Sequence, residues 1–535
     1  MSEEGDGRPG GDVPPPGLAY STALQSRIVA AARASGRPLL DAGRGQPNWT
    51  ATAPRAGFFR LGAFAVEEAG RVSRHDAWGE LPVPEGLHDR LLHSLRADGS
   101  EGAVFLSHAL AYAVDDLGLP GDAFVHELVR AVLGAGYPAP TRMLTLLERV
   151  LERYLVAMAG APDGPPGTYQ VFATEGGAAA MAYVFRSLRE NHLIGPGRAV
   201  AVATPVFTPY LQIPVLEDFG VRVVEVQAAH NTPYRFDDGF LEQLTDPAIA
   251  VFFVVNPGNP DTRAIRPEKL RQLRDFVLER RPDLVIVADT AYATFVDDFR
   301  GVFSVLPRNT VLIHSFSKSV GATGNRLGFV GLAADTVVDE VLAAQSDDVR
   351  ARLDERYSGL APTSSGIPFS ARLVADSREV ALHNIAGLST VDQVQMALFA
   401  LGHLMPSGEA YRTATRAELA RRSYALFDPL GLEPPGGQDS LYYALVDLLA
   451  AVRVRHGADG VRRLQGTVTP EDLLLRLARA HGVIVQTGGL FHSAGWDVRV
   501  CLAALDADQL SSVGQAIVDE IDSSVGPQAP ARGVG

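Results

Sequence analysis

The sequence contains a single cysteine, Cys501, among 535 residues. One cysteine cannot form a disulfide within the chain, and so low a content fits the reducing conditions of the cytoplasm. No run of 18 or more apolar residues occurs, so the sequence predicts no membrane span. Its opening residues lack the cationic start and the apolar stretch of a secretory signal. We therefore expect a cytoplasmic protein without a membrane partner.

Basic residues are fewer than acidic ones, with 48 lysines and arginines against 62 aspartates and glutamates. The chain has a formal net charge of −14 and a pI near 5.4, and no stretch gathers its basic residues into a stripe. An acidic surface repels a polyanion, which excludes nucleic acid as the expected partner. The hydrophobic and charged fractions, 46% and 21%, are ordinary for a globular protein. Because the length is too great for one compact core, at least two lobes are predicted.

Short β-branched runs occupy the middle of the chain, and most of them are apolar on both faces. Helical or loop segments separate them, which is typical of a largely parallel sheet buried under helices. The runs are Ala199–Ala203, Arg222–Val226, Ile249–Val255, Leu284–Ala288, Thr310–Ser315 and Gly328–Leu332. Apolar spacings of three and four residues predict helices elsewhere, notably between Gly70 and Gly134. We expect an α/β protein with a large sheet domain and a smaller α+β domain.

The segment HSFSKSVGATGNRLGFVGL places Lys318 just past the end of a predicted strand. Ligands of such sheets bind at the carboxyl ends of the strands, and a lysine amine can form a Schiff base with an aldehyde cofactor. Ser315, Ser317 and Arg326 carry groups that can hold a phosphate. Taken alone, the pattern is more often a solvated loop lysine.

Two further strand ends carry polar residues. VIVADTAYATF ends a strand in Asp289, and Tyr292 follows three residues later. A buried carboxylate needs a cation, which a protonated pyridine ring supplies, although an aspartate here is also a common helix N-cap. Asn259, in FFVVNPGNPDT, can donate to a ring oxygen, as Tyr292 can, or can form a plain Asn-Pro turn.

Small residues open a helix in FATEGGAAAMAYVF, at Gly176, Gly177 and Ala178. They leave backbone N–H groups and the positive end of the helix available to a phosphate. Phe207, in TPVFTPY, either stacks on a cofactor ring or belongs to the core. Each element is weak alone, but all of them follow successive strand ends. In that order they resemble the fold type I aminotransferase superfamily, which depends on pyridoxal 5'-phosphate (PLP).

The resemblance narrows to the aspartate 4-decarboxylase family, whose members also have aspartate aminotransferase activity. It runs from about Ala23 to Leu505 and includes the helical stretch that ordinary aminotransferases lack. The segments that carry it are DAGRGQPNW, TEGGAAAMAYVFRSLREN, YATFVDDFRGVFSVLPRNT, SFSKSVGATGNRLG, RLVADSREVALHNIAGLSTVDQVQMALF and WDVRVCLAAL.

By this resemblance, Lys318, Asp289 and Tyr292 are the catalytic residues, and no metal site is assigned. Lys318 bonds the cofactor and moves protons, while Asp289 pairs with the pyridine nitrogen. The resemblance further implies PLP contacts from Gly177, Ala178, Phe207, Asn259, Tyr292, Ser315, Ser317 and Arg326. Arg499 would grip the substrate α-carboxylate as a bidentate fork, and Arg44 and Gly45 match a loop on the substrate side. The alternative for Arg44 is a surface arginine without a binding role. The same alternative applies to Arg499, but the apolar residues beside it make it weaker there.

The resemblance also implies self-association and a domain division. Tyr137, in GAGYPAP, matches a tyrosine lent to the phosphate of a neighbouring subunit, so we expect a homodimer or a higher oligomer. The expected segments are a disordered tail (1–20), the N-terminal part of the small domain (21–75), a helical insertion (76–135), the large PLP-binding domain (136–395), the C-terminal small domain (396–525) and a flexible tail (526–535).

The first hypothesis for the reaction is β-decarboxylation of L-aspartate to L-alanine and carbon dioxide. A transaminase acting on an acidic amino acid, or on a sulfinate or phosphonate analogue, is the alternative, and one site can do both. A non-catalytic relative of the fold is a third reading, which the intact lysine, aspartate, tyrosine and arginine oppose. Ser319, Val320 and Asn325 replace residues that are usually aromatic in the family. We expect this loss of bulk to admit more water or a larger distal group, which would weaken the preference for decarboxylation.

Overall fold

The computed structural model describes residues 18–137, 142–216, 220–227, 238–382, 386–436 and 438–526. Of the two tails expected at 1–20 and 526–535, only residues 18–20 and 526 fall within these ranges, and residues 18–20 belong to a helix. Within the same ranges, no helix is both long and apolar enough to cross a membrane.

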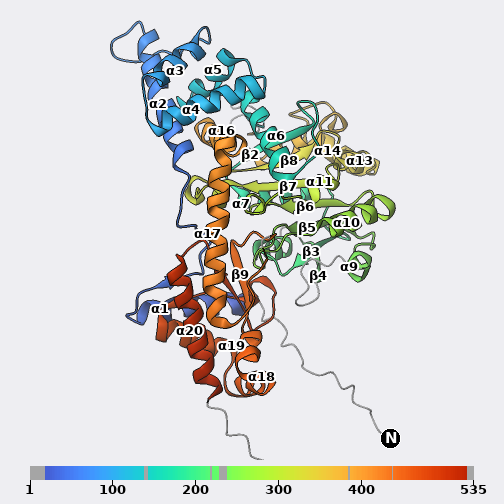
Figure 1. Ribbon diagram of the computed structural model, residues 1–535. Helices are drawn as coiled ribbons and strands as arrows, with labels where there is room; N and C mark the ends of the chain where they lie inside the picture. Colours follow the sequence, from blue (N-terminus) through green and yellow to red (C-terminus); the bar gives the residue numbers. More distant parts are fainter. Residues whose placement is uncertain are drawn as a thin grey trace, which may run out of the picture.

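A seven-stranded sheet forms the centre of the molecule (Figure 1). In spatial order the strands are β2 (Tyr169–Thr174), β8 (Gly328–Ala333), β7 (Thr310–Ser315), β6 (Val285–Asp289), β5 (Ile249–Val255), β3 (Ala199–Thr204) and β4 (Arg222–Gln227). The sheet is parallel except for β8, which runs antiparallel to its neighbours β2 and β7. The predicted α/β class is confirmed, and the six predicted runs are strands β3 to β8. Strand β2 was not predicted.

Helices cover both faces of this sheet. On one face lie α7 (Gly177–Glu190), α13 (Val337–Ala343) and α15 (Phe369–Ser377), and on the other lie α9 (Asp238–Gln243), α10 (Pro267–Arg280) and α11 (Val302–Val305). Side chains alternate along a strand, so Val200 and Val202 of β3 enter the first core while Ala199 and Ala201 enter the second. Two buried faces explain why these strands are apolar throughout.

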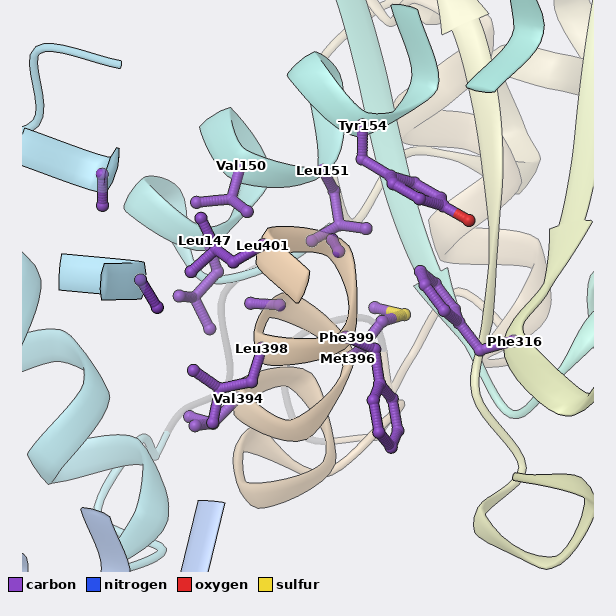
Figure 2. Packing of buried hydrophobic residues seen from close by; sticks show 14 of the residues in the cluster. Leu147, Val150, Leu151, Tyr154, Phe316, Val394, Met396, Leu398, Phe399 and Leu401 are labelled. Carbon is purple, nitrogen blue, oxygen red and sulfur yellow. The ribbon is translucent and has the colours of Figure 1, made fainter. Parts of the chain in front are cut away.

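A helical lobe packs against one end of the sheet domain. It contains α2 (Thr52–Val72), α3 (Leu87–Arg96), α4 (Glu101–Ala111) and α5 (Gly121–Val132), which share one core with α6 (Thr145–Ala159) and α16 (Thr390–Leu404). Figure 2 shows side chains of α6 facing those of α16, with Phe316 beside them. The Phe316 ring lies 5.1 Å from the Tyr154 ring and 6.3 Å from the Phe399 ring, centroid to centroid. This packing anchors the short segment that follows β7.

The remaining lobe is built from segments near both ends of the described chain. It comprises α1 (Leu18–Ala34), β1 (Leu40–Asp41), α17 (Pro406–Leu430), β9 (Tyr443–Asp447), α18 (Leu448–Thr467), α19 (Pro470–His481), β10 (Val483–Ile484), β11 (Gln486–Thr487), β12 (Asp497–Cys501) and α20 (Ala507–Val525). Strand β1 pairs in parallel with β10, and β9 and β11 flank β12. Because β1 pairs with β10, the loop Gly43–Gly45 that follows β1 lies beside Arg499 of β12. The domain boundary expected at 395/396 falls inside α16, and the long α17 runs on from the sheet domain into this lobe (Figure 1).

Candidate active site

The polar residues predicted from the sequence gather at one edge of the large sheet. Ser315 ends β7, Asp289 ends β6, and Asn259 lies in the loop after β5. Gly177 begins α7 shortly after β2, and Phe207 follows β3. Because β2 to β7 all run in the same direction, their carboxyl ends meet at this edge, where α/β sheets bind ligands.

Lys318 lies on the one-turn helix α12 (Phe316–Ser319). Its Nζ donates a hydrogen bond of 2.6 Å to the carbonyl oxygen of Gly45, and the Tyr442 hydroxyl donates to the same oxygen at 2.9 Å. A Cβ atom on residue 45 would lie 2.4 Å from the Tyr443 hydroxyl and 2.9 Å from Lys318 Nζ. Glycine at position 45 therefore lets the N-terminal loop approach the lysine this closely, and a larger residue would displace the ends of both side chains.

Asp289 presents a carboxylate without an ion-pair partner in the described part of the chain. Its Oδ1 accepts from the backbone N–H of Ala291 at 2.9 Å, and its Oδ2 accepts from the Tyr210 hydroxyl at 3.1 Å. Burial raises the pKa of Asp289 to about 6, while these hydrogen bonds and the nearby Lys318 ammonium oppose the rise. The group is thus mainly charged at neutral pH, and it can pair with a cation brought by a ligand.

Arg499, Asn259, Tyr292 and Tyr443 form a continuous chain of hydrogen bonds. Arg499 Nη1 donates to Asn259 Oδ1 at 2.9 Å, and Asn259 Nδ2 donates to the Tyr292 hydroxyl at 3.4 Å. The Tyr292 hydroxyl in turn donates to the Tyr443 oxygen at 3.3 Å. Burial raises the pKa of Tyr292 well above its ordinary value, so this phenol stays protonated. The chain fixes the orientation of all four side chains.

Arg499 is a buried cation, with 4% of its surface exposed. Its Nη2 donates to the carbonyl oxygen of Gly43 at 3.0 Å, but its Nε has no hydrogen-bond partner among the described residues. The guanidinium carbon lies 4.1 Å from the Tyr443 ring centroid and 4.7 Å from that of Phe491. A buried guanidinium that lies between two rings, with no carboxylate partner in the described part of the chain, is suited to binding an anionic ligand.

A second anion cradle lies at the N-terminus of α7. Gly176 adopts a φ of +89°, and a Cβ there would lie 2.7 Å from Arg326 Nη2. Ser315 Oγ accepts from the backbone N–H of Ser317 at 3.2 Å, and Gly177 packs against Ser315. The backbone donors at the start of the helix, the Arg326 guanidinium and the serine hydroxyls are groups that can together bind a phosphate. Ala178 is the second residue of the same helix.

A cavity of about 510 Å³ lies between Lys318 and Arg499, and neither Asp289 nor Arg326 lines it. Lys318, Phe207, Gly45, Tyr443 and Arg499 line it, together with Arg44. The Arg44 side chain is 70% exposed, and its Nε lies 3.1 Å from Asp41 Oδ2. The structure thus brings the predicted lysine, both predicted arginines of the substrate side and the loop glycine to one cavity.

Three predicted features lie elsewhere. Tyr137 is 77% exposed and does not line this cavity. Ser319 and Val320 line a separate cavity of about 260 Å³ between α12, α16 and α17, while Asn325 Nδ2 donates to Gln395 Oε1 at 2.6 Å. The expectation that Ser319, Val320 and Asn325 widen the substrate pocket is therefore not supported, because none of the three lines the cavity that contains Lys318.

Three tyrosines of the site had no predicted role. The Tyr210 hydroxyl donates a hydrogen bond to Asp289, the Tyr442 hydroxyl donates to the carbonyl oxygen of Gly45, and Tyr443 lines the cavity. In the sequence they stand among apolar residues, and an aromatic residue in such a setting is more often part of the core. The Tyr442-Tyr443 pair at the start of β9 is the available signal, because adjacent residues of a strand point to opposite faces.

Known proteins share this chain's sequence and fold over most of its length. The family model described as aminotransferase class I and II matches residues 166–517. The bifunctional aspartate aminotransferase and L-aspartate beta-decarboxylase of Pseudomonas sp is 40% identical over 496 residues, which cover 92% of this chain and 93% of that protein. These findings confirm the resemblance drawn from the sequence.

Solved structures show the same fold at lower identity. A single mutant of Thermus thermophilus aspartate aminotransferase matches with a TM-score of 0.57 and 18% identity, covering 94% of this chain and 96% of that one. The aromatic aminotransferase from Pyrococcus horikoshii OT3 matches with a TM-score of 0.55 and 18% identity, covering 92% and 97%.

Proposed function

We propose, from the premise that this chain belongs to the aminotransferase class I and II family, that it is a PLP-dependent enzyme acting on L-aspartate. The proposed main reaction releases the β-carboxylate as carbon dioxide and forms L-alanine, with transamination as a second outcome of the same site. The observation that carries the proposal is the shared cavity of Lys318 and the buried, carboxylate-free Arg499. The Pseudomonas relative, whose name includes both activities, supports the choice of substrate.

The residues present fit PLP. Asp289 offers a carboxylate in need of a cation and would pair with the pyridine nitrogen. Arg326 and the start of α7 would hold the phosphate, and Asn259 and Tyr292 would contact the ring oxygen. When bound, PLP supplies an aldehyde that bonds to amines and a ring system that accepts electron pairs from the substrate.

The chain's own residues would bind, orient and deprotonate the amino acid. Arg499 would hold the α-carboxylate with its N–H groups. Nη1 and Nη2 each have one hydrogen bond within the chain, to Asn259 and to Gly43, and Nε has none among the described residues. Lys318 Nζ, hydrogen-bonded to Gly45, would take the proton from Cα as a general base. Arg44, at the exposed rim of the cavity, is proposed for the distal carboxylate.

The test is one incubation of the PLP-loaded enzyme with L-aspartate and 2-oxoglutarate, an oxo acid that accepts the amino group in transamination, in which alanine, carbon dioxide and oxaloacetate are all quantified. We expect alanine and carbon dioxide in equal amounts, with oxaloacetate as a minor product. Cysteine sulfinate and a phosphonate analogue of aspartate, run in parallel, measure the tolerance for the distal group. Oxaloacetate as the main product would favour the transaminase alternative, and no product from any acidic amino acid would contradict the assignment.

Gly45→Ala should reduce kcat/KM for aspartate by about 10²-fold, because the added methyl displaces both Lys318 Nζ and the Tyr443 hydroxyl. The displaced atoms are the ends of flexible side chains, so the melting temperature should change little. Gly99→Ala is the matched control, since nothing lies within 4 Å of a Cβ at that position. Kinetics and thermal denaturation of the two variants measure this. An unchanged kcat/KM in Gly45→Ala would mean that the close approach of the loop has no catalytic role.

We also propose that the active unit is at least a dimer, in which Tyr137 reaches the phosphate site of a neighbouring subunit. Its 77% exposure within one chain leaves the hydroxyl available to a partner. Sedimentation velocity of the active enzyme should show no monomer at assay concentrations, and Tyr137→Phe should lower the affinity for PLP about tenfold through loss of one hydrogen bond to a charged group. A fully active monomer would refute this arrangement.

A further inference from the structure

Tyr443 lies beside the reactive lysine. It begins β9, its side chain lines the 510 Å³ cavity, and its hydroxyl and Lys318 Nζ both lie within 3 Å of the point that a Cβ on residue 45 would occupy. The hydroxyl oxygen is therefore a close neighbour of the amine. A substrate whose Cα lies at Lys318 would therefore have its neighbouring carbon on the side of the cavity that Tyr443 also lines.

The hydrogen bonding of Tyr443 leaves its hydroxyl hydrogen free to point toward the cavity. The Tyr292 hydroxyl donates to the Tyr443 oxygen at 3.3 Å, which leaves the hydrogen of Tyr443 for another acceptor. The Arg499 guanidinium lies 4.1 Å from the centroid of the Tyr443 ring. Tyr443 can therefore donate its hydrogen to a group in the cavity while its oxygen keeps the hydrogen bond from Tyr292.

We propose that Tyr443 is the general acid that protonates the β-carbon of the substrate after carbon dioxide leaves. The bond between Cβ and the carboxylate carbon breaks, its electron pair remains with the substrate, and the pair forms a new C–H bond with the Tyr443 proton. The phenolate regains a proton from water or from the Lys318 ammonium. This role rests on the proposed β-decarboxylation, and transamination does not require it because Cβ keeps its carboxylate there.

The Tyr443→Phe variant removes the hydroxyl but retains the ring that lies against Arg499. It therefore separates proton donation by the hydroxyl from packing of the ring. Alanine formation should fall by about 10²-fold, the lower end of the contribution of a positioned acid. Oxaloacetate formation with an added oxo-acid acceptor should stay within about threefold of the wild type. The affinity for succinate, a dicarboxylate that cannot react, should also be retained in calorimetry, since Arg499 keeps its position. Tyr169→Phe is the control: it removes a hydroxyl that donates to Pro162 at 2.9 Å, and Tyr169 does not line the cavity.

Three results would overturn the role. Alanine formation within about threefold of the wild type would show that another group protonates Cβ. A parallel loss of alanine, oxaloacetate and succinate affinity would show that Tyr443 acts only by positioning Arg499. A wild-type enzyme that releases no carbon dioxide from aspartate would contradict the proposed function itself, and this role with it.

Discussion

Lys318→Ala should reduce the turnover of aspartate by about 10⁴-fold, the upper end of what a positioned acid–base group contributes. The variant should also lack the visible absorption of lysine-bound PLP. The physical reason is that Lys318 Nζ is the amine that lines the 510 Å³ cavity with Arg499, so its loss removes both the covalent anchor and the proton carrier. Steady-state kinetics and absorption spectra of the PLP-loaded variant measure the two losses.

The chain supplies a matched control, because it contains only two lysines, Lys269 and Lys318. Lys269 lies on α10, where its Nζ donates to Gln272, and it does not line the cavity. Lys269→Ala should therefore keep the full rate and the full spectrum. Circular dichroism should be unchanged in both variants, because neither side chain belongs to a hydrophobic core. Normal turnover by Lys318→Ala would refute the whole assignment.

Asp289→Asn should slow the removal of the Cα proton by about 10² to 10⁴-fold while leaving PLP bound. The carboxylate would keep the pyridine nitrogen protonated, and a neutral amide cannot balance that positive charge. Exchange of the Cα hydrogen in deuterium oxide, followed by NMR, isolates this step from the later ones. Asp347→Asn, a change on the exposed surface of α14 (Asp347–Arg356), should leave the exchange unaltered. Unchanged exchange in Asp289→Asn would show that the carboxylate does not support the electron sink.

The sequence predicted the large sheet well because burial on both faces leaves a strong pattern. Strands β3 to β8 begin or end within one residue of the predicted runs, each a stretch of β-branched or small apolar residues. Strand β2 was missed because Tyr169–Thr174 directly precedes a glycine-rich helix start and reads as part of that loop. The site residues that follow β5, β6 and β7 could be predicted for the same reason, because the ends of parallel strands meet at one edge of the sheet.

Contacts between distant segments could not be predicted in the same way. The hydrogen bond from Lys318 to Gly45 joins residues 273 positions apart and depends on the pairing of β1 with β10. Nor does the sequence tell which face of a one-turn helix a residue occupies. Lys318 faces the substrate cavity, whereas Ser319 and Val320 face the cavity on the other side of α12. The predicted weakening of decarboxylation rested on these two residues and on Asn325, whose amide donates to Gln395, so the structure gives it no support.

The most direct test of the central claim is to locate the covalent bond between PLP and the protein. Borohydride reduction of the PLP-loaded enzyme, followed by proteolysis and mass spectrometry, fixes the cofactor to the amine that holds it. We expect the phosphopyridoxyl group on the peptide that contains Lys318, in one copy per chain, and none on the peptide that contains Lys269. Absence of the group from Lys318, or its presence on Lys269 instead, would contradict the account.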